Sequence, residues 1–285
     1  MNLWATIGAA ALVLIGGGAL IGYGGFRRAD LKAERAYRQV LSGPKLVQRR
    51  FDPRQFQGLP EVAQRYFQHA VAPGTPIYST AEVQMEGTFL LGDKEKFKTY
   101  EMTARQALRP PDQFIWIPRL RSGPITITGS DALVAGDAWT RFWILRLVPV
   151  ANVQTSPDLV RPAQFRAALE GALWLPFTLL PDNGVEWQQT GRDEARVILK
   201  RFKPEPIMLT LRLGPEGAVR EVVGQRWSNV NPEKRFRLQP FGGVIRGETT
   251  FQGLTIPTDV AVGNNYGTED YLPFFQAKIV SAKYS

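Results

Sequence analysis

The N-terminal stretch constrains this chain most, because residues 3–26 contain no charged side chain and are followed directly by Arg27 and Arg28. A helix needs about 20 apolar residues to cross a bilayer, and backbone amides in lipid must be bonded internally. A cleaved signal peptide has a basic start and an Ala-x-Ala-like cleavage site, to which residues 1–2 and 22–26 are poor matches. We therefore expect a retained transmembrane helix over residues 1–28.

Basic residues gather directly after this stretch. Residues 27–65 contain ten Lys and Arg against four Asp and Glu, whereas the remaining chain carries 25 basic and 22 acidic residues. A nucleic-acid site would concentrate the charge on the folded domain, so we expect no nucleic-acid partner. Beside a membrane each basic residue contributes about 1 kcal/mol of attraction to anionic lipid. The predicted membrane-surface residues are Arg27, Arg28, Lys32, Arg35 and Arg38, with an ordinary solvated helix face as the alternative.

The same charges predict which side of the membrane the domain occupies. Lys and Arg favour the cytoplasmic side of a span, which predicts a single-pass protein of the cell membrane with a cytoplasmic domain. The chain has no Cys, which suits a reducing compartment and a periplasm alike. A periplasmic or extracellular domain therefore stays open.

The rest of the chain predicts one β-rich domain. We expect an anchor over residues 1–28, a basic juxtamembrane segment over residues 29–55 and a single domain over residues 56–285. Apolar residues at helical spacing predict helices over 59–71 and 162–173, and residues 30–41 are typical of a short polar helix that leaves the membrane. Alternating patterns with short turns predict about ten strands, and so long a meander must curl to protect its edges. The expected fold is mainly β (α+β): an antiparallel curled half-barrel with two amphipathic helices, one of which crosses the concave face.

Several classes of chemistry are excluded by the residue types. With one His and no Cys, the chain cannot form thiolate metal sites, His-rich zinc sites or a cysteine nucleophile. It contains no G-x-S-x-G elbow, no phosphate-binding loop and no strand-linked G-x-G-x-x-G. We therefore expect no metal and no cofactor, and we assign no catalytic residue.

Aromatic residues cluster in the middle of the chain and offer a candidate binding cavity. Trp139, Arg141 and Trp143 share one face of a predicted strand, with Phe142 on the other. Glu170 stands four residues after Arg166 on a predicted helix. It either forms an ion pair with Arg166 or accepts a hydrogen bond from the backbone where the chain leaves the helix. The alternative is that the aromatics simply fill a core. The candidate ligand-binding residues are Phe114, Trp116, Arg141, Trp143, Glu170, Trp174 and Phe177.

Several motifs together resemble a known family. They are Leu59-Pro60-x-x-Ala63-x-Arg65-Tyr66, Glu86-Gly87-x-Phe89, Leu169-Glu170-x-x-x-Trp174-x-Pro176 and Gly184-Val185-x-Trp187. This order resembles a family of uncharacterised, membrane-anchored bacterial proteins, the DUF6544/DUF6920-like domains of unknown function. The family has no assigned activity, so no catalytic residue is carried over. Its layout is similar to the LolA and LolB lipoprotein carriers, which hold acyl chains between a concave sheet and covering helices. This chain lacks the lipoprotein Cys of the anchored carriers.

Three functional hypotheses follow. The first is a membrane-anchored module, in contact with membrane lipids, that binds a lipid or other hydrophobic ligand; it predicts a cavity of several hundred Å³. The second is an accessory protein that docks a membrane protein partner, which predicts a filled interior and an exposed apolar patch. The third is an enzyme that uses carboxylates, which predicts acidic side chains converging in a cleft with shifted pKa values. The residue types favour a binding protein over an enzyme.

Overall fold

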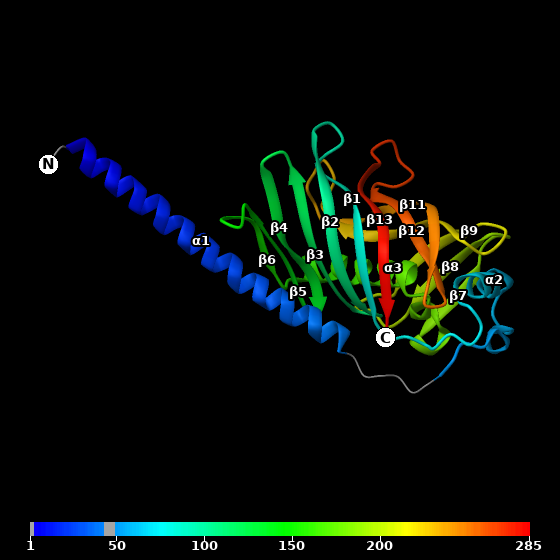
Figure 1. The fold of residues 1–285 in the computed structure, drawn as a ribbon. Coiled ribbons are helices and arrows are strands. Elements are labelled where there is room, and N and C mark those ends of the chain that lie inside the picture. The colour runs from blue at the N-terminus through cyan, green and yellow to red at the C-terminus, as the bar shows by residue number, and fades with distance from the viewer. Residues whose placement is uncertain (1–2, 43–48) are drawn as a thin grey trace.

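The structure, a computed structural model, describes residues 3–42 and 49–285, and for residues 3–16 it describes the backbone alone. The described chain forms one antiparallel sheet of thirteen strands, curled but not closed, together with three α-helices (Figure 1). The expected mainly-β class, antiparallel pairing and curled half-barrel are confirmed. The expected number of about ten strands is wrong.

One reason for the difference is the turn between the strands β5 (Asp137–Ile144) and β6 (Val148–Gln154). The sequence predicts one strand over residues 139–148, but the chain turns at Leu145 and Arg146, whose φ angles are 51° and 63°. Turns of this backbone conformation are usually marked by Asn or Gly, so the sequence gives no signal for this one. The strands are β1 (Ala81–Gly92), β2 (Phe97–Arg109), β3 (Gln113–Ser122), β4 (Ile125–Val134), β5 (Asp137–Ile144), β6 (Val148–Gln154), β7 (Val185–Gln189), β8 (Glu194–Leu199), β9 (Ile207–Leu213), β10 (Val219–Ser228), β11 (Arg237–Phe251), β12 (Leu254–Asn264) and β13 (Leu272–Tyr284).

The order of the strands explains where the long internal helix lies. The sheet order is β6-β5-β4-β3-β2-β1-β13-β12-β11-β10-β9-β8-β7, so β1 and β13 pair in its interior while β6 and β7 are its two edges. Helix α3 (Pro157–Trp174) connects these edges, and it contacts β4, β5, β10 and β12 as it crosses the concave face. The main hydrophobic core lies between α3 and the sheet. Helix α2 (Glu61–Ala70) packs beside it, against β7, β8 and β12.

The N-terminal helix differs from the expectation. A transmembrane helix over residues 1–28 and a separate helix over 30–41 were expected, whereas α1 is one helix, Leu3–Leu41, that projects from the domain (Figure 1). The side chains of residues 1–16, which include much of the expected anchor, lie outside the described part. Across the described residues, no helix combines the length and the hydropathy that a membrane span requires.

The second half of α1 packs on the outer, convex face of the sheet. Its buried residues recur at helical spacing and meet small and aromatic side chains of β2 to β5. The Tyr37 hydroxyl donates a hydrogen bond to Glu82 Oε1 at 3.0 Å, and the Arg109 Nε–H donates one to the Val40 carbonyl at 2.9 Å. The predicted juxtamembrane segment is therefore partly a docked helix. The buried residues of α1 in this contact are Ala33, Ala36, Tyr37 and Val40.

The predicted membrane-surface residues lie on the exposed side of the docked helix. Arg27, Arg28, Lys32, Arg35 and Arg38 are all exposed. Arg27 forms a surface ion pair with Asp30 at 3.0 Å, and the Lys32 ammonium lies 4.8 Å from the centre of the Trp139 ring. Their binding to lipid stays a prediction.

A glycine controls how closely α1 approaches the β5–β6 hairpin. A Cβ atom on Gly22 would lie 2.0 Å from the Leu147 carbonyl oxygen, whereas a Cβ on Gly25 would meet nothing within 4 Å. Both Gly→Ala changes improve helix propensity by about 1 kcal/mol, but only Gly22→Ala overpacks the contact, at a cost of about 1–3 kcal/mol. We expect Gly22→Ala to lower hydrogen-exchange protection of α1 in the full chain, and Gly25→Ala to preserve it. Equal protection in both variants would show that the helix does not dock at this hairpin.

Candidate functional site

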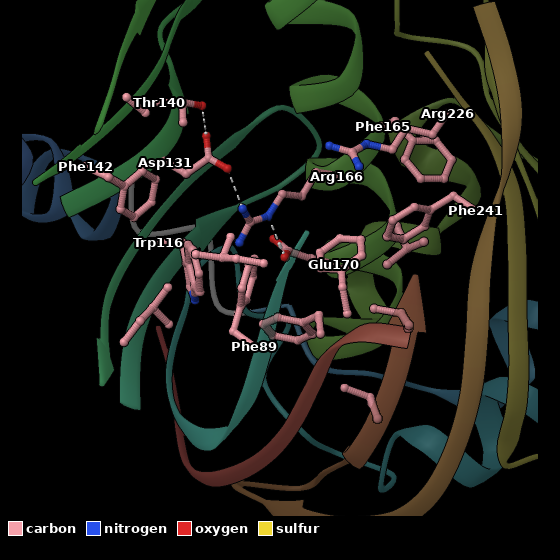
Figure 2. Close-up of a pocket in the computed structure, with 18 of the residues that line it drawn as sticks. Phe89, Trp116, Asp131, Thr140, Phe142, Phe165, Arg166, Glu170, Arg226 and Phe241 are labelled. Carbon is pink, nitrogen blue, oxygen red and sulfur yellow. Dashed lines mark hydrogen bonds and ion pairs between the residues drawn. The ribbon is translucent and has the colours of Figure 1, made fainter. Parts of the chain in front are cut away.

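A cavity of about 500 Å³ lies between α3 and the concave face of the sheet. Its wall is mostly aromatic and aliphatic (Figure 2). The volume falls within the range of about 300–1,000 Å³ that is usual for small-molecule sites. The lining side chains are Phe89, Leu91, Trp116, Leu120, Ile127, Asp131, Thr140, Phe142, Val150, Ala151, Phe165, Arg166, Leu169, Glu170, Leu173, Trp174, Arg226, Phe241, Val260, Val262, Phe274 and Phe275.

The cavity opens to solvent beside the β1–β2 hairpin and the edge strand β6. Leu91 and Val150 both line the cavity, and they are 40% and 51% exposed. More exposed apolar side chains continue from β6 into its preceding turn and onto the facing part of α1, where Gly22 meets Leu147. An apolar surface therefore adjoins one side of the opening. Its exposed residues are Leu20, Ile21, Tyr23, Leu145, Leu147 and Val148.

Arg166 organises the polar part of the cavity. Its Nη1 donates to Asp131 Oδ2 at 2.6 Å and its Nε to Glu170 Oε1 at 2.7 Å (Figure 2). The remaining carboxylate oxygens are also bonded: Thr140 donates to Asp131 Oδ1 at 2.9 Å, and Gln106 donates to Glu170 Oε2. All four carboxylate oxygens of the network therefore have a partner.

The fold dictates this arrangement. Asp131 and Thr140 are direct cross-strand partners on β4 and β5, and Arg166 and Glu170 stand one turn apart on α3. The Arg166 guanidinium also lies 4.9 Å from the centre of the Trp116 ring, so its charge is stabilised by an aromatic face as well as by carboxylates.

Burial and charge oppose one another in this network. Burial alone would lower the pKa of Arg166, but Glu170 and Asp131 outweigh it and hold that pKa above its ordinary value. Burial raises the pKa of Glu170 above its ordinary value, although Arg166 and Gln106 oppose the rise.

A second arginine reaches the cavity from β10. Figure 2 shows the side chain of Arg226 extending toward Arg166 from beside Phe165. Its Nη1 donates to Asn264 Oδ1 at 3.3 Å, and its guanidinium lies 5.2 Å from the centre of the Phe241 ring. Burial lowers the pKa of Arg226 to about 10, a value at which the side chain is still charged at neutral pH.

Three of the seven candidate residues line the cavity: Trp116, Glu170 and Trp174. Phe114 lies directly beneath the wall, where its ring centre is 4.8 Å from the Arg166 guanidinium. Phe177 packs elsewhere in the core, 6.3 Å from Phe51 between ring centres.

Arg141 and Trp143 lie on the opposite side of the sheet from the cavity. The Trp143 ring centre is 5.9 Å from that of Phe26 on α1, and Arg141 lies over Trp139, 5.6 Å from its ring centre. The sequence pattern placed these residues correctly on one face of β5, but the cavity face is the one that carries Thr140 and Phe142. Arg141 and Trp143 are therefore not among the residues that line this cavity.

Sequence reasoning also missed residues that the cavity needs. Asp131 was not among the candidate residues, and Arg166 entered only as the helix ion-pair partner considered for Glu170. Arg226 and the phenylalanines of β1, β11 and β13 were also missed, because strand alternation shows which residues share a face without showing which face is concave. An isolated basic residue on an otherwise apolar strand face was the available clue for Arg226.

Comparison with known proteins identifies the family. Residues 49–277 match the family of unknown function DUF6544. The chain belongs to the DUF6544 family. The expected family is therefore confirmed, and no curated protein matches this DUF6544 chain.

Three solved structures share parts of this layout at low similarity. A domain from Vibrio parahaemolyticus that is named for outer membrane lipoprotein sorting is 8% identical, with 79% of this chain and 91% of that chain covered and a TM-score of 0.38. A LolA superfamily protein from Nitrosomonas europaea is 10% identical, with 79% and 90% covered and a TM-score of 0.37. A β-barrel-like DUF1849 protein from Brucella abortus is 9% identical, with 73% and 99% covered and a TM-score of 0.27. With TM-scores this low, these likenesses carry no argument about the function of this DUF6544 protein.

Proposed function

We propose that this DUF6544 protein binds a lipid or another hydrophobic ligand in the cavity between α3 and the sheet. The observation that carries the proposal is the cavity itself, which is large, mostly apolar and open at one side. An apolar wall with a few fixed polar groups is the usual construction of a small-molecule site. The function is sequestration, in which the ligand leaves water or the bilayer without covalent change.

The two competing hypotheses fit the cavity less well. An accessory protein was expected to have a filled interior, which a cavity of about 500 Å³ does not match. An enzyme was expected to have converging carboxylates, and Asp131 and Glu170 do converge on Arg166. Each oxygen of these two carboxylates accepts a hydrogen bond, and both groups are ion-paired with Arg166, an arrangement that favours a structural network over a general base.

The proposal includes attachment to a membrane through the apolar segment over residues 1–28. The exposed apolar side chains of α1 and of the β5–β6 turn adjoin the opening of the cavity. A membrane at this surface would cover those side chains and place the opening against the lipid. The ligand would then pass between bilayer and cavity over a short apolar path.

Filling the cavity from β6 tests ligand binding without disturbing the ion-pair network. Ala151 pairs with Phe142 on the cavity face, whereas the next residue, Asn152, pairs with Arg141 on the outer face. We expect Ala151→Phe to occupy part of the cavity and to lower bound lipid at least about tenfold, equivalent to about 1.4 kcal/mol. Asn152→Phe is the matched control, with the same new ring on the same strand. The measurement is native mass spectrometry of the full chain after gentle extraction from membranes.

The outcomes separate clearly. A lipid-range mass on the wild-type chain and on Asn152→Phe, but not on Ala151→Phe, supports a ligand in this cavity. Equal retention by both variants places the lipid elsewhere on the protein. A wild-type chain that carries no lipid and binds none when lipid is added contradicts the proposed function.

A further inference from the structure

Two arginines of the described chain face the same cavity, and among the described residues only one of them forms an ion pair with an acidic side chain. Arg166 binds both Asp131 and Glu170. Within the described ranges 3–42 and 49–285, no carboxylate lies within the 4.0 Å salt-bridge distance of the Arg226 side-chain nitrogens. The hydrogen bond that Arg226 makes, to Asn264 at 3.3 Å, is to a neutral amide, and its other guanidinium N–H groups donate no hydrogen bond to the described residues.

An arginine in this position calls for a physical explanation. Removing a guanidinium from water is costly unless an anion or several hydrogen bonds compensate it. Burial lowers the pKa of Arg226 to about 10, because the attraction of Asp131 and Glu170, opposed by the nearby positive charge of Arg166, does not offset the loss of water. A neutral side chain of similar length would avoid this cost if the cavity held only hydrocarbon.

Arg166 adds a second donor on the same side. Its Nε and Nη1 are bonded to the two carboxylates, while its Nη2 makes no hydrogen bond to the part of the chain that the structure describes. Figure 2 shows the Arg226 guanidinium extending toward Arg166, whose own guanidinium lies between Asp131 and Glu170. Guanidinium groups bind carboxylate and phosphate oxygens more strongly than neutral donors do.

The rest of the cavity offers an apolar path away from these charges. Beyond Arg166 the wall includes Trp116, Phe89 and Phe142 (Figure 2). Leu91 and Val150 line the cavity at its opening. A ligand that fits both the two arginines and the apolar wall of the cavity needs an anionic end and a hydrocarbon end.

We propose that the ligand is an anionic amphiphile whose carboxylate or phosphate group binds Arg226, with its hydrocarbon chain along the aromatic wall. This inference rests on the proposed function, because it specifies the chemical class of ligand for the same cavity. Arg226 sets the preference for negative charge, and Arg166 contributes its free Nη2–H. A fatty acid and a phosphate-bearing single-chain lipid share this chemistry.

The test compares three probes with the same hydrocarbon chain: dodecanoate, dodecyl phosphate and dodecanol. Binding of each to the full chain in a mild detergent is measured by titration calorimetry. We expect the wild-type chain to bind one or both anions at least about tenfold more tightly than dodecanol, as hydrogen bonds to a charged group require. The better of the two anions identifies the head group as carboxylate or phosphate.

Arg226→Gln should remove this preference. We expect the affinity for the anions to fall to that for dodecanol, while the affinity for dodecanol is unchanged. Arg226→Lys should keep part of the preference, because the positive charge remains. Arg141→Gln is the matched control: burial also lowers the pKa of Arg141, but its side chain lies on the outer face of β5. It should leave all three affinities unchanged.

The results distinguish this inference from the proposed function. Equal binding of the three probes by the wild-type chain, or an anion preference that survives in Arg226→Gln, overturns the anionic ligand and leaves hydrophobic binding intact. Failure of the wild-type chain to bind any probe counts against both. If Arg226→Gln does not fold, wild type is compared with Arg226→Lys instead. The proposal expects Arg226→Lys to lose part of the preference for anions and to bind dodecanol as the wild type does. An anion preference equal to that of the wild type would overturn a specific role for the Arg226 guanidinium.

Discussion

Replacing Arg166 with Met is expected to lower the free energy of unfolding by about 3–5 kcal/mol, the usual effect of removing one partner from a buried ion network. Arg166 is the shared donor to Asp131 and Glu170, at 2.6 and 2.7 Å. Without it, two carboxylates face an apolar cavity with only Thr140 and Gln106 as partners. Chemical denaturation of the full chain measures the change.

A matched control lies on the same helix. Arg161 pairs with Glu205, but Glu205 is half exposed and the pair is at the surface. We expect Arg161→Met to cost no more than about 1 kcal/mol. Equal losses in Arg166→Met and Arg161→Met would mean that the cavity network is hydrated like a surface pair.

The loss in Arg166→Met should also depend on pH. Burial raises the pKa of Glu170, and Arg166 opposes that rise. Without the guanidinium the folded-state pKa of Glu170 would lie further above its unfolded value, so the folded chain would bind more protons than the unfolded chain. Stability then rises as the pH falls. We expect the difference between variant and wild type to be smaller at about pH 5 than at about pH 7. A difference that grows on acidification would contradict this account of the network.

Replacing Trp174 with Ala is the second change for which we expect a large effect, a loss of about 3–5 kcal/mol. Trp174 ends α3, is 1% exposed and contributes to both the core and the cavity wall. Its removal would leave a void that the surrounding core cannot fill without moving the helix. Thermal and chemical unfolding of the full chain measure the loss.

Trp227 is the matched control for this change. It lies half-buried at the surface, where it stacks on Phe236 and donates a hydrogen bond to Asp158 at 2.8 Å. We expect Trp227→Ala to cost about 1 kcal/mol. A loss below that value in Trp174→Ala would show that the end of α3 is loosely packed. Because Trp174→Ala combines a stability defect with a change of the cavity, loss of ligand in this variant would not identify the binding site, which Ala151→Phe does.

The parts of the fold that follow from local pattern were predictable. A helix was expected over residues 59–71 and α2 spans Glu61–Ala70; one was expected over 162–173 and α3 spans Pro157–Trp174. In both helices the buried face is set by apolar residues at helical spacing, a pattern formed by residues that are close together in the sequence. Pro162 was expected to open the second helix, and it lies inside α3 instead.

The contacts between distant segments were not predictable in the same way. The alternation in β5 showed that Trp139, Arg141 and Trp143 share a face, but both faces of this strand are covered, one by α1 and the other by the cavity. Aromatic residues therefore appear on both sides, and the pattern could not select between them. Small residues such as Ala33 and Ala36 read as part of a polar helix, although their size is what allows α1 to approach the sheet closely.

The interior pairing of β1 with β13 has a consequence for how the protein is made. β1 ends at Gly92 and its neighbour β13 begins at Leu272, so the long stretch between them must be synthesised before the two halves of the sheet can join. The hairpins from β1 to β6 pair locally and early, but until then β1 presents a free edge of twelve residues. The growing chain therefore carries an aggregation-prone edge for most of its translation, and the arrival of β13 sets the moment at which that exposure ends.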